Sequence, residues 1–201
     1  MNQPKETYAN RHFIIYKPYG YLSQFVNNQH QRRNKKLLGE LYNFPEGTMS
    51  IGRLDQKSEG LLFLTTNGRV SDQVRSKEVE KEYYIQVDGL ITQEAITKLE
   101  KGVEIRFDRK YYTTLPAKAR ILNPAPKFKA AGRKRGENHG PTSWASITIS
   151  EGKYRQVRKM SAAVGFPVLR LIRVRIGNIS LFPLEAGEII EVDEFDLHIQ
   201  M

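Results

Sequence analysis

The sequence predicts an α+β fold, and three observations lead to it. Short β-prone runs recur along the whole chain, whereas few stretches have helical periodicity. Strands and helices do not alternate strictly, as they would in a parallel βαβ sheet. The chain has 201 residues, 39% of them hydrophobic, which is enough for one large core or two small lobes. No run approaches the roughly 18 apolar residues of a membrane span, and the N-terminus lacks a secretory signal.

The first half of the chain is expected to contain mainly strands and turns. The expected elements are a strand at 12–16, a turn at 17–20, a mobile loop at 26–36, a short helix or turn at 37–42, a strand at 61–64 and a short helix after residue 67. Pro18 and Gly20 favour the turn because proline and glycine interrupt strand pairing. Asn67 is a suitable N-cap for the helix, with Val70 and Val74 on one side.

The second half is expected to contain the two best helices. The expected elements are a strand at 81–87, a helix at 92–101, strands at 103–107, 111–115 and 118–122, a long loop at 123–142, a strand at 144–150, a helix at 154–164 and a strand at 169–176. Thr92 is a plausible N-cap for the first helix, and Gly102 can end it. The 123–142 segment holds three prolines, three glycines and five basic residues, which is typical of a loop.

The charge of the chain predicts a polyanionic partner. Thirty-two Lys and Arg against 22 Asp and Glu give a net charge of +10 and a pI near 9.7. The C-terminal segment 185–201 is acidic, so the basic residues concentrate elsewhere. They cluster at 32–36, at 127–135 and at 153–175.

The expected helix at 154–164 carries a cationic face. Arg155, Arg158 and Lys159 fall at helical spacing on one side. Such a face is often simply solvated. However, three arginines (Arg170, Arg173 and Arg175) follow within one short strand, where they are costly unless an anion or acid meets them. The combination favours a phosphate-lined groove over a solvated face.

Several kinds of active site are absent from the sequence. There is no cysteine, and the four histidines (His12, His30, His139 and His198) show no metal-ligand spacing. No Walker loop, GxGxxG or GxSxG pattern is found. A carboxylate is therefore the best remaining catalytic candidate, since it can act as nucleophile or base without a cofactor. Asp55 stands just ahead of the apolar run at 61–64, where an aspartate is more often a turn or helix cap.

Four segments, taken in order, resemble the motifs of one family. They are KPYG at 17–20, GRLD at 52–55 followed by SEGLL at 58–62, KEY at 81–83 and GKYRQVRKM at 152–160. The chain is similar to RNA pseudouridine synthases of the RsuA type, closest to the branch that modifies one uridine of 23S ribosomal RNA and lacks an S4 RNA-binding domain. A lone KPxG would mean little, but the second motif is long and specific.

The resemblance implies the pseudouridine synthase fold, with a mixed, mainly antiparallel central sheet, flanking helices and a catalytic cleft. It implies a single catalytic domain over 1–201, with a small N-terminal α/β lobe at roughly 1–50 plus later strands. No S4 domain is expected.

The resemblance also assigns roles to individual residues. Asp55 is the expected catalytic carboxylate, and attack on C1′, addition to C6 and removal of a 2′ proton all remain open for it. Tyr83 is expected to stack on the base and to assist proton removal. Arg158 is expected to pair with Asp55 and keep it ionised. Leu169 is expected to pack near the base. Arg53 is either a structural ion pair or a contact that holds the target nucleotide out of its helix.

The remaining basic candidates are expected to bind RNA; they are Lys153, Arg155, Lys159, Lys134 and Arg135. The expected partner is 23S ribosomal RNA or an assembling large ribosomal subunit, with the uridine flipped out of its helix. No metal, cofactor, nucleotide or membrane is expected, and the protein is expected to be a cytoplasmic monomer. The rival reading is a non-catalytic RNA- or ribosome-binding protein, which would not need Asp55, Tyr83 and Arg158. A DNA-binding regulator lacks a helix-turn-helix or zinc-finger pattern.

Overall fold

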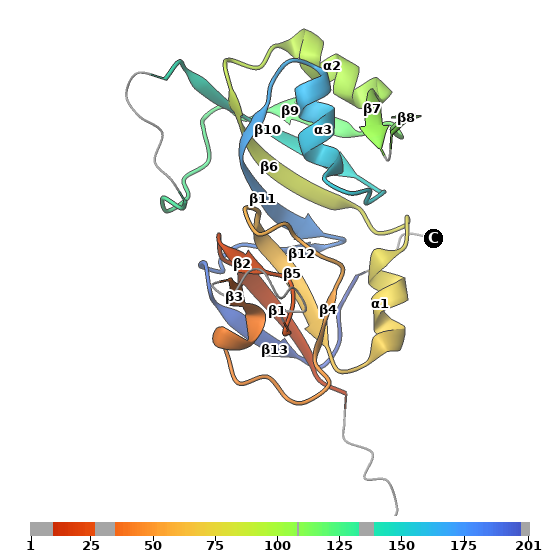
Figure 1. Cartoon of the computed structure of the whole chain (residues 1–201), viewed down its shortest axis with the longest axis vertical. Coiled ribbons are helices and arrows are strands. Elements are labelled where there is room, and N and C mark those ends of the chain that lie inside the picture. Colours follow the sequence, from red (N-terminus) through yellow and green to blue (C-terminus); the bar gives the residue numbers. More distant parts are fainter. Residues whose placement is uncertain (1–9, 27–34, 108, 133–138, 198–201) are drawn as a thin grey trace, which may run out of the picture.

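A mixed β-sheet forms the centre of the molecule. The computed structural model describes residues 10–26, 35–107, 109–132 and 139–197, and within them a nine-stranded sheet has the order β13-β1-β5-β11-β6-β10-β9 (Figure 1). Its strands are β1 (His12–Lys17), β4 (Met49–Ile51), β5 (Glu59–Thr65), β6 (Lys81–Asp88), β9 (Lys118–Ile121), β10 (Thr142–Ile149), β11 (Val168–Ile176), β12 (Ile179–Ser180) and β13 (Ile189–Val192). β4 pairs with β5, and β12 pairs with β11.

Two small sheets and three helices complete the described fold. One small sheet joins β2 (Tyr21–Leu22) to β3 (Lys36–Leu37), and the other joins β7 (Glu104–Phe107) to β8 (Lys110–Thr113). The helices are α1 (Gly68–Arg75), α2 (Gln93–Lys101) and α3 (Gln156–Ala163), with a short 3-10 helix, η1 (Leu38–Glu40). Among the described residues, no helix has both the length and the apolar character needed to cross a membrane.

A parallel pairing joins the two antiparallel halves of the central sheet. β5 and β11 run parallel through two residue pairs, one of which is Gly60 with Arg173. The other strand pairings of this sheet are antiparallel. Gly60 has a φ of +104°, and a Cβ there would lie 2.2 Å from the carbonyl oxygen of Arg173. The predicted α+β class with a mixed, mainly antiparallel sheet is confirmed.

The core is divided between the two halves of the sheet. In the upper half of Figure 1, α2 and α3 pack on β6, β10 and β11, and Ile96 and Met160 are fully or almost fully buried there. In the lower half, every residue of β5 is buried. Leu62 and Leu64 face one cluster with Leu38, while Leu61 and Phe63 face another. β5 therefore forms the buried centre of the lower half, and its N-terminal end lies beside the Asp55 loop.

Most predicted elements are confirmed within one to three residues. Asn67 caps α1 by accepting a hydrogen bond from Arg69 N, and Thr92 caps α2 by accepting from Ala95 N. The predicted loop at 26–36 falls mostly outside the described residues. β13 was not predicted from the sequence, because the segment around this strand was interpreted only as an acidic tail. In the structure, β13 pairs with β1. The predicted helix at 154–164 is too long at its N-terminus, because Arg155 has left-handed backbone angles (φ +53°) and α3 begins after it.

Candidate active site

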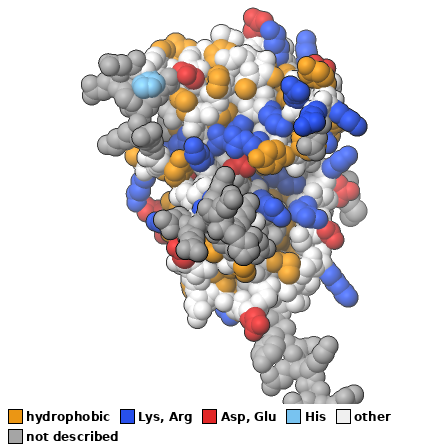
Figure 2. Space-filling model, viewed as in Figure 1, with side chains coloured by type: hydrophobic (Ala, Val, Ile, Leu, Met, Phe, Trp, Pro, Cys, Tyr) orange, Lys and Arg blue, Asp and Glu red, His pale blue; other side chains and the backbone are white. Residues whose placement is uncertain are grey.

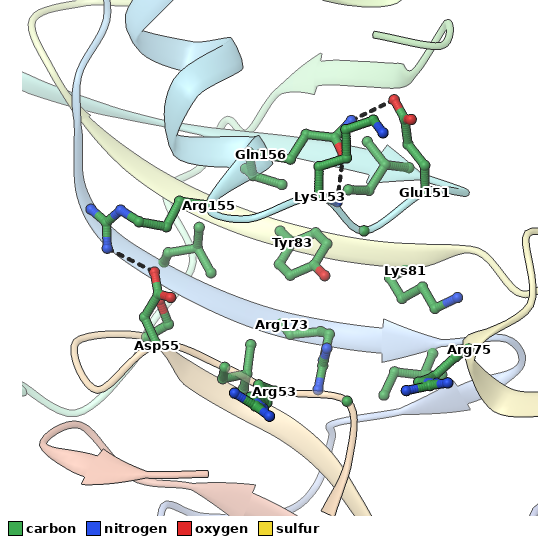
Figure 3. A pocket seen from close by; sticks show the side chains of 18 of the residues that line it. Arg53, Asp55, Arg75, Lys81, Tyr83, Glu151, Lys153, Arg155, Gln156 and Arg173 are labelled. Carbon is green, nitrogen blue, oxygen red and sulfur yellow. Dashed lines mark hydrogen bonds and ion pairs between the residues drawn. The ribbon is translucent and has the colours of Figure 1, made fainter. Parts of the chain in front are cut away.

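A cavity of about 480 Å³ opens between the two halves of the sheet (Figure 3). Its walls come from the loop before β5, the end of α1, β6, the segment that leads into α3, and β11. The polar and charged residues around it are Arg53, Asp55, Ser58, Arg75, Lys81, Glu151, Lys153, Arg155, Gln156, Arg158 and Arg173, together with Tyr83. The cavity therefore has a strongly cationic lining with few acids.

The loop that carries Asp55 is fixed by hydrogen bonds on both sides of that residue. Ser23 Oγ accepts from Leu54 N at 3.0 Å and donates to Leu54 O at 2.9 Å. Gly20 N donates to Gln56 O at 2.8 Å, and the Gln56 side chain donates back to Gly20 O at 3.1 Å. The KPYG turn thus supports the GRLD loop directly. Because its backbone is anchored on both flanks, Asp55 has a defined position at the cavity wall.

Two arginines approach the carboxylate of Asp55, which is 29% exposed. Arg155 Nη1 donates a hydrogen bond of 2.9 Å to Oδ2. Arg158 Nε lies 3.7 Å from the same oxygen, so it forms an ion pair but no hydrogen bond. The expected pairing of Arg158 with Asp55 is therefore present at longer range, and the direct bond comes from Arg155 instead. Arg155 reaches Asp55 because its left-handed backbone turns it away from the helical face assumed for it.

Arg158 also braces the loop that carries Asp55. Its terminal nitrogens donate to Lys57 O at 3.2 Å, to Ser58 Oγ at 3.1 Å and to Val168 O at 3.3 Å. Arg158 therefore ties the Asp55 loop to the start of β11. Its Nε is buried, lies near Asp55 Oδ2 and has no hydrogen-bond partner within residues 10–26, 35–107, 109–132 and 139–197. A small movement of the carboxylate would complete that bond.

Three polar residues that line the cavity come from β6 and β11. Tyr83 and Lys81 lie two residues apart on β6, so both point to the same side of the strand (Figure 3). Arg173 is only 6% exposed, and its Nε donates to Leu61 O at 2.7 Å. Its Nη2 is buried and has no hydrogen-bond partner in the part of the chain that the structure describes. Arg173 is thus a buried cation at the cavity wall with an unused donor.

Two predicted site residues lie differently from expectation. Leu169 is 42% exposed and does not line the cavity, whereas Leu171 does. The register of β11 shifts between Val168 and Arg170, so strict alternation fails at Leu169. Arg53 lines the cavity, is exposed and forms no ion pair among the described residues. The structural ion pair considered for Arg53 is therefore not found there.

The arginines of β11 do not form the continuous phosphate-binding row that their spacing suggested. Arg170 forms a bidentate pair with the buried Glu59, with both contacts at 2.8 Å. Arg175 bonds to Glu80 and Glu82 at 3.3 and 3.1 Å. Internal acids thus neutralise both, so for these two arginines the acid alternative holds and the phosphate-lined groove does not include them. Of the three, Arg173 alone faces the cavity.

The other predicted RNA contacts fall into two groups. Lys153 lines the cavity, and the ammonium of Lys159 donates to Arg106 O at 2.9 Å. Lys134 and Arg135 lie outside the described residues.

Sequence reasoning missed Leu171 and Arg173 as cavity residues. Their period-two spacing along β11 was the available signal, because it places both on one face of a strand.

Burial lowers the pKa of two lysines in this region. Desolvation lowers the pKa of Lys17 to about 7, although Glu59 and Asp55 oppose the shift. Its ammonium donates to Pro18 O and Tyr21 O at 2.9 and 2.7 Å. Desolvation, followed by the nearby Arg173, lowers the pKa of Lys81 to about 8. Figure 2 shows Lys and Arg side chains gathered across the middle of the molecule, at the level of β6 and β11.

The start of α3 is held by a buried acid. Glu151 accepts hydrogen bonds from the Tyr112 hydroxyl at 2.6 Å, from Leu115 N at 2.9 Å and from the Gln156 amide at 2.6 Å. Burial alone would raise the pKa of Glu151, but these hydrogen bonds outweigh it and the net shift is downward. Glu151 thus links the β7–β8 hairpin to the segment that carries Arg155. Among the described residues, no three His, Cys, Asp or Glu side chains are close enough to hold a metal ion.

Comparison with known proteins gives one consistent result. The family described as RNA pseudouridylate synthase matches residues 11–163. The chain is 39% identical over 191 residues to the ribosomal large subunit pseudouridine synthase E of Vibrio parahaemolyticus, covering 93% of this chain and 76% of the relative. The enzyme of the same name from Xanthomonas axonopodis pv. citri is 39% identical over 169 residues, covering 82% and 85%. A crystal structure of a pseudouridylate synthase superposes with a TM-score of 0.71 at 26% identity, covering 91% of this chain and 70% of that one.

Proposed function

The chain belongs to the RNA pseudouridylate synthase family, and we propose that it isomerises one uridine of 23S ribosomal RNA to pseudouridine. Relatives named ribosomal large subunit pseudouridine synthase E support this choice of RNA. The observation that carries the proposal is the cavity in which Asp55 pairs with Arg155 and Arg158, and which Tyr83 also lines. This cavity places a carboxylate beside a cationic surface that we propose faces the RNA.

The reaction needs few groups, and the cavity supplies them. The bond between N1 of uracil and C1′ of ribose breaks, the base rotates, and a new bond forms between C5 and C1′. C5 then loses its proton to solvent, and N1 gains one, so atoms balance without an oxidant or a co-substrate. We assign the acid–base or nucleophilic work to Asp55. Arg155 and Arg158 keep a negative charge favourable at this position.

The uracil base needs a binding surface within the cavity. We assign stacking on uracil to Tyr83, and packing at its edge to Leu171, which takes the role first expected for Leu169. Uracil carries negative charge while it is detached from the sugar. Lys81 and Arg173 line the same cavity, so their positive charges would stabilise that state. We assign this electrostatic role to Arg173 in particular, because its Nη2 has no hydrogen-bond partner among the described residues.

The target uridine must leave its helix to enter a cavity of this kind. Unstacking a nucleotide costs a few kcal/mol, which phosphate contacts of the surrounding cations would offset. Arg53 is exposed at the cavity wall without an ion pair among the described residues, and we assign it to the flipped-out nucleotide. The substrate must present this uridine unpaired. We propose that both free 23S ribosomal RNA and the assembling large subunit can do so and are substrates.

Tritium release tests the proposal. Unmodified large-subunit RNA labelled with [5-³H]uridine should release one tritium per RNA molecule with the wild-type protein. Asp55→Asn should reduce the rate at least about a thousandfold, because the amide is a poor nucleophile and base. Asp193→Asn changes an exposed acid outside the cavity and should be as active as the wild type. Activity of Asp55→Asn near the wild-type level would contradict the assignment. Release from small-subunit RNA instead would contradict the target.

A further inference from the structure

An exposed tyrosine stands at the rim of the cavity. Tyr154 is 68% exposed and occupies a turn between Lys153 and Arg155, both of which line the cavity. Consecutive Cα atoms are about 3.8 Å apart, so the Tyr154 backbone is close to the backbones of two residues that line the cavity. The left-handed backbone of Arg155 helps to shape this turn. Tyr154 therefore lies beside the space that the target uridine would enter.

Lysines stand over the aromatic rings that surround this turn. The Lys159 ammonium lies 5.7 Å from the centre of the Tyr154 ring and 5.0 Å from that of Phe107. The Lys153 ammonium lies 4.1 Å from the centre of the Tyr112 ring and 5.7 Å from that of Phe107. Phe107 and Tyr112 belong to the β7–β8 hairpin. These contacts interleave two cations with three rings on one surface.

Among the described residues, neither the Lys153 nor the Lys159 ammonium forms an ion pair, although the charge of Lys153 interacts with the carboxylate of Glu151. Lys159 instead donates to the carbonyl oxygen of Arg106, which orients the ammonium. An exposed ring with positively charged side chains beside it suits a ligand with a flat face and a negative group. An unpaired nucleotide has both, in its base and its phosphate.

We propose that Tyr154, with Lys153 and Lys159, binds an unpaired nucleotide adjacent to the target uridine. The base stacks on the Tyr154 ring, and its phosphate lies against the two ammonium groups. This inference rests on the proposed function, because the contact holds the flanking RNA while the target uridine occupies the cavity. Stacking uses the face of a base and not its edges, so the contact should tolerate different bases at that position.

The hairpin provides a matched control on its other face. Tyr111 is 72% exposed, much like Tyr154, and pairs with Arg106 across the hairpin. Neighbouring residues of a strand point to opposite faces, so Tyr111 faces away from the side on which Tyr112 meets Lys153. Removing Tyr111 therefore deletes an exposed ring of the same kind without touching the proposed site.

Two measurements test the proposal. In the first, the full chain is titrated with short oligouridylates that carry one 2-aminopurine, whose fluorescence falls on stacking. Tyr154→Ala should bind about tenfold more weakly and lose the quenching, whereas Tyr154→Phe and Tyr111→Ala should behave as the wild type. In the second, tritium release from labelled large-subunit RNA should show a KM raised about tenfold for Tyr154→Ala, with kcat at saturating RNA unchanged.

The outcomes separate this proposal from the proposed function. Loss of quenching in Tyr154→Ala alone supports the stacking site, even if no RNA releases tritium with the wild-type protein. Tritium release by the wild type with an unchanged KM and unchanged quenching in Tyr154→Ala overturns the stacking site and leaves the enzyme assignment intact. An equal loss of quenching in Tyr111→Ala also overturns the stacking site, because the loss would then not be specific to the Tyr154 side of the hairpin.

Discussion

Arg155 and Asp55 lie 100 residues apart in the sequence, and in the folded chain Arg155 Nη1 donates a 2.9 Å hydrogen bond to Asp55 Oδ2. Arg158 approaches the same oxygen only to 3.7 Å. The two arginines therefore have different structural roles around the carboxylate. Arg155, which is 41% exposed, holds the carboxylate itself, while the more deeply buried Arg158 holds the loop that carries it.

These different roles predict different losses in the two alanine variants. Arg158→Ala should lower the free energy of unfolding by about 2–4 kcal/mol, because it removes hydrogen bonds to Lys57 O, Ser58 Oγ and Val168 O. Arg155→Ala removes a partly exposed ion pair and should cost less than about 1 kcal/mol. Both should slow single-turnover tritium release. Urea denaturation measures the stability, and equal costs in the two variants would contradict these different roles.

Arg173 should contribute to chemistry more than to RNA affinity. Arg173→Met removes a buried charge from the cavity wall and should lower kcat about a hundredfold, with little change in KM, if that charge stabilises detached uracil. Arg173→Lys should recover part of kcat, because it restores the charge without the planar guanidinium. Arg69→Met, at an exposed position of α1, is the control. A raised KM with an unchanged kcat would instead make Arg173 a simple binding residue.

Lys17 should make the stability of the protein depend on pH. Burial lowers its pKa in the folded chain to about 7, against an ordinary value of 10.5. Between these values the unfolded chain binds more protons than the folded one, so the free energy of unfolding should rise with pH. The slope should reach at most about 1.4 kcal/mol per pH unit. Below the folded pKa, the ammonium is charged in both states and the full burial cost applies.

The measurement compares variants by urea denaturation from about pH 6.5 to about pH 9.5, the range in which the difference in bound protons develops. Lys17→Met should lose the part of the rise that Lys17 contributes and keep the smaller part that comes from Lys81, whose pKa burial also lowers. Lys101→Met removes an exposed lysine at the end of α2 and should keep the whole rise. Parallel curves for the wild type and Lys17→Met would show that Lys17 does not titrate in this range.

Gly60 should tolerate no side chain. A Cβ at this position would lie 2.2 Å from Arg173 O and 2.6 Å from Arg173 N, both backbone atoms of the paired strand. Its φ of +104° is also unfavourable for other residues. Gly60→Ala should therefore cost more than about 3 kcal/mol, measured by thermal and urea denaturation. Gly68→Ala, in the first turn of α1, has ordinary space around it and should be neutral or stabilising.

The sequence by itself determined the features that depend on neighbouring residues. The caps at Asn67 and Thr92 and most of the strands follow from local propensity, and the structure confirms them. The order of the GRLD, KEY and GKYRQVRKM segments was sufficient to indicate the family. It also singled out Asp55 and Tyr83, and both line one cavity. These inferences succeed because periodicity, turn residues and motif spacing act over a few residues of chain.

Only the tertiary structure decided which charges meet. Helical spacing placed Arg155 and Arg158 on one face, but the left-handed turn at Arg155 gave the direct bond with Asp55 to Arg155. The arginine row of β11 suggested phosphate ligands, yet Glu59 neutralises Arg170 across a strand pairing that no local pattern encodes. A shifted register likewise moved Leu169 away from the cavity. Charge partners and burial depend on segments brought together from about 100 residues apart, and a single sequence specifies those pairings only through the packed core.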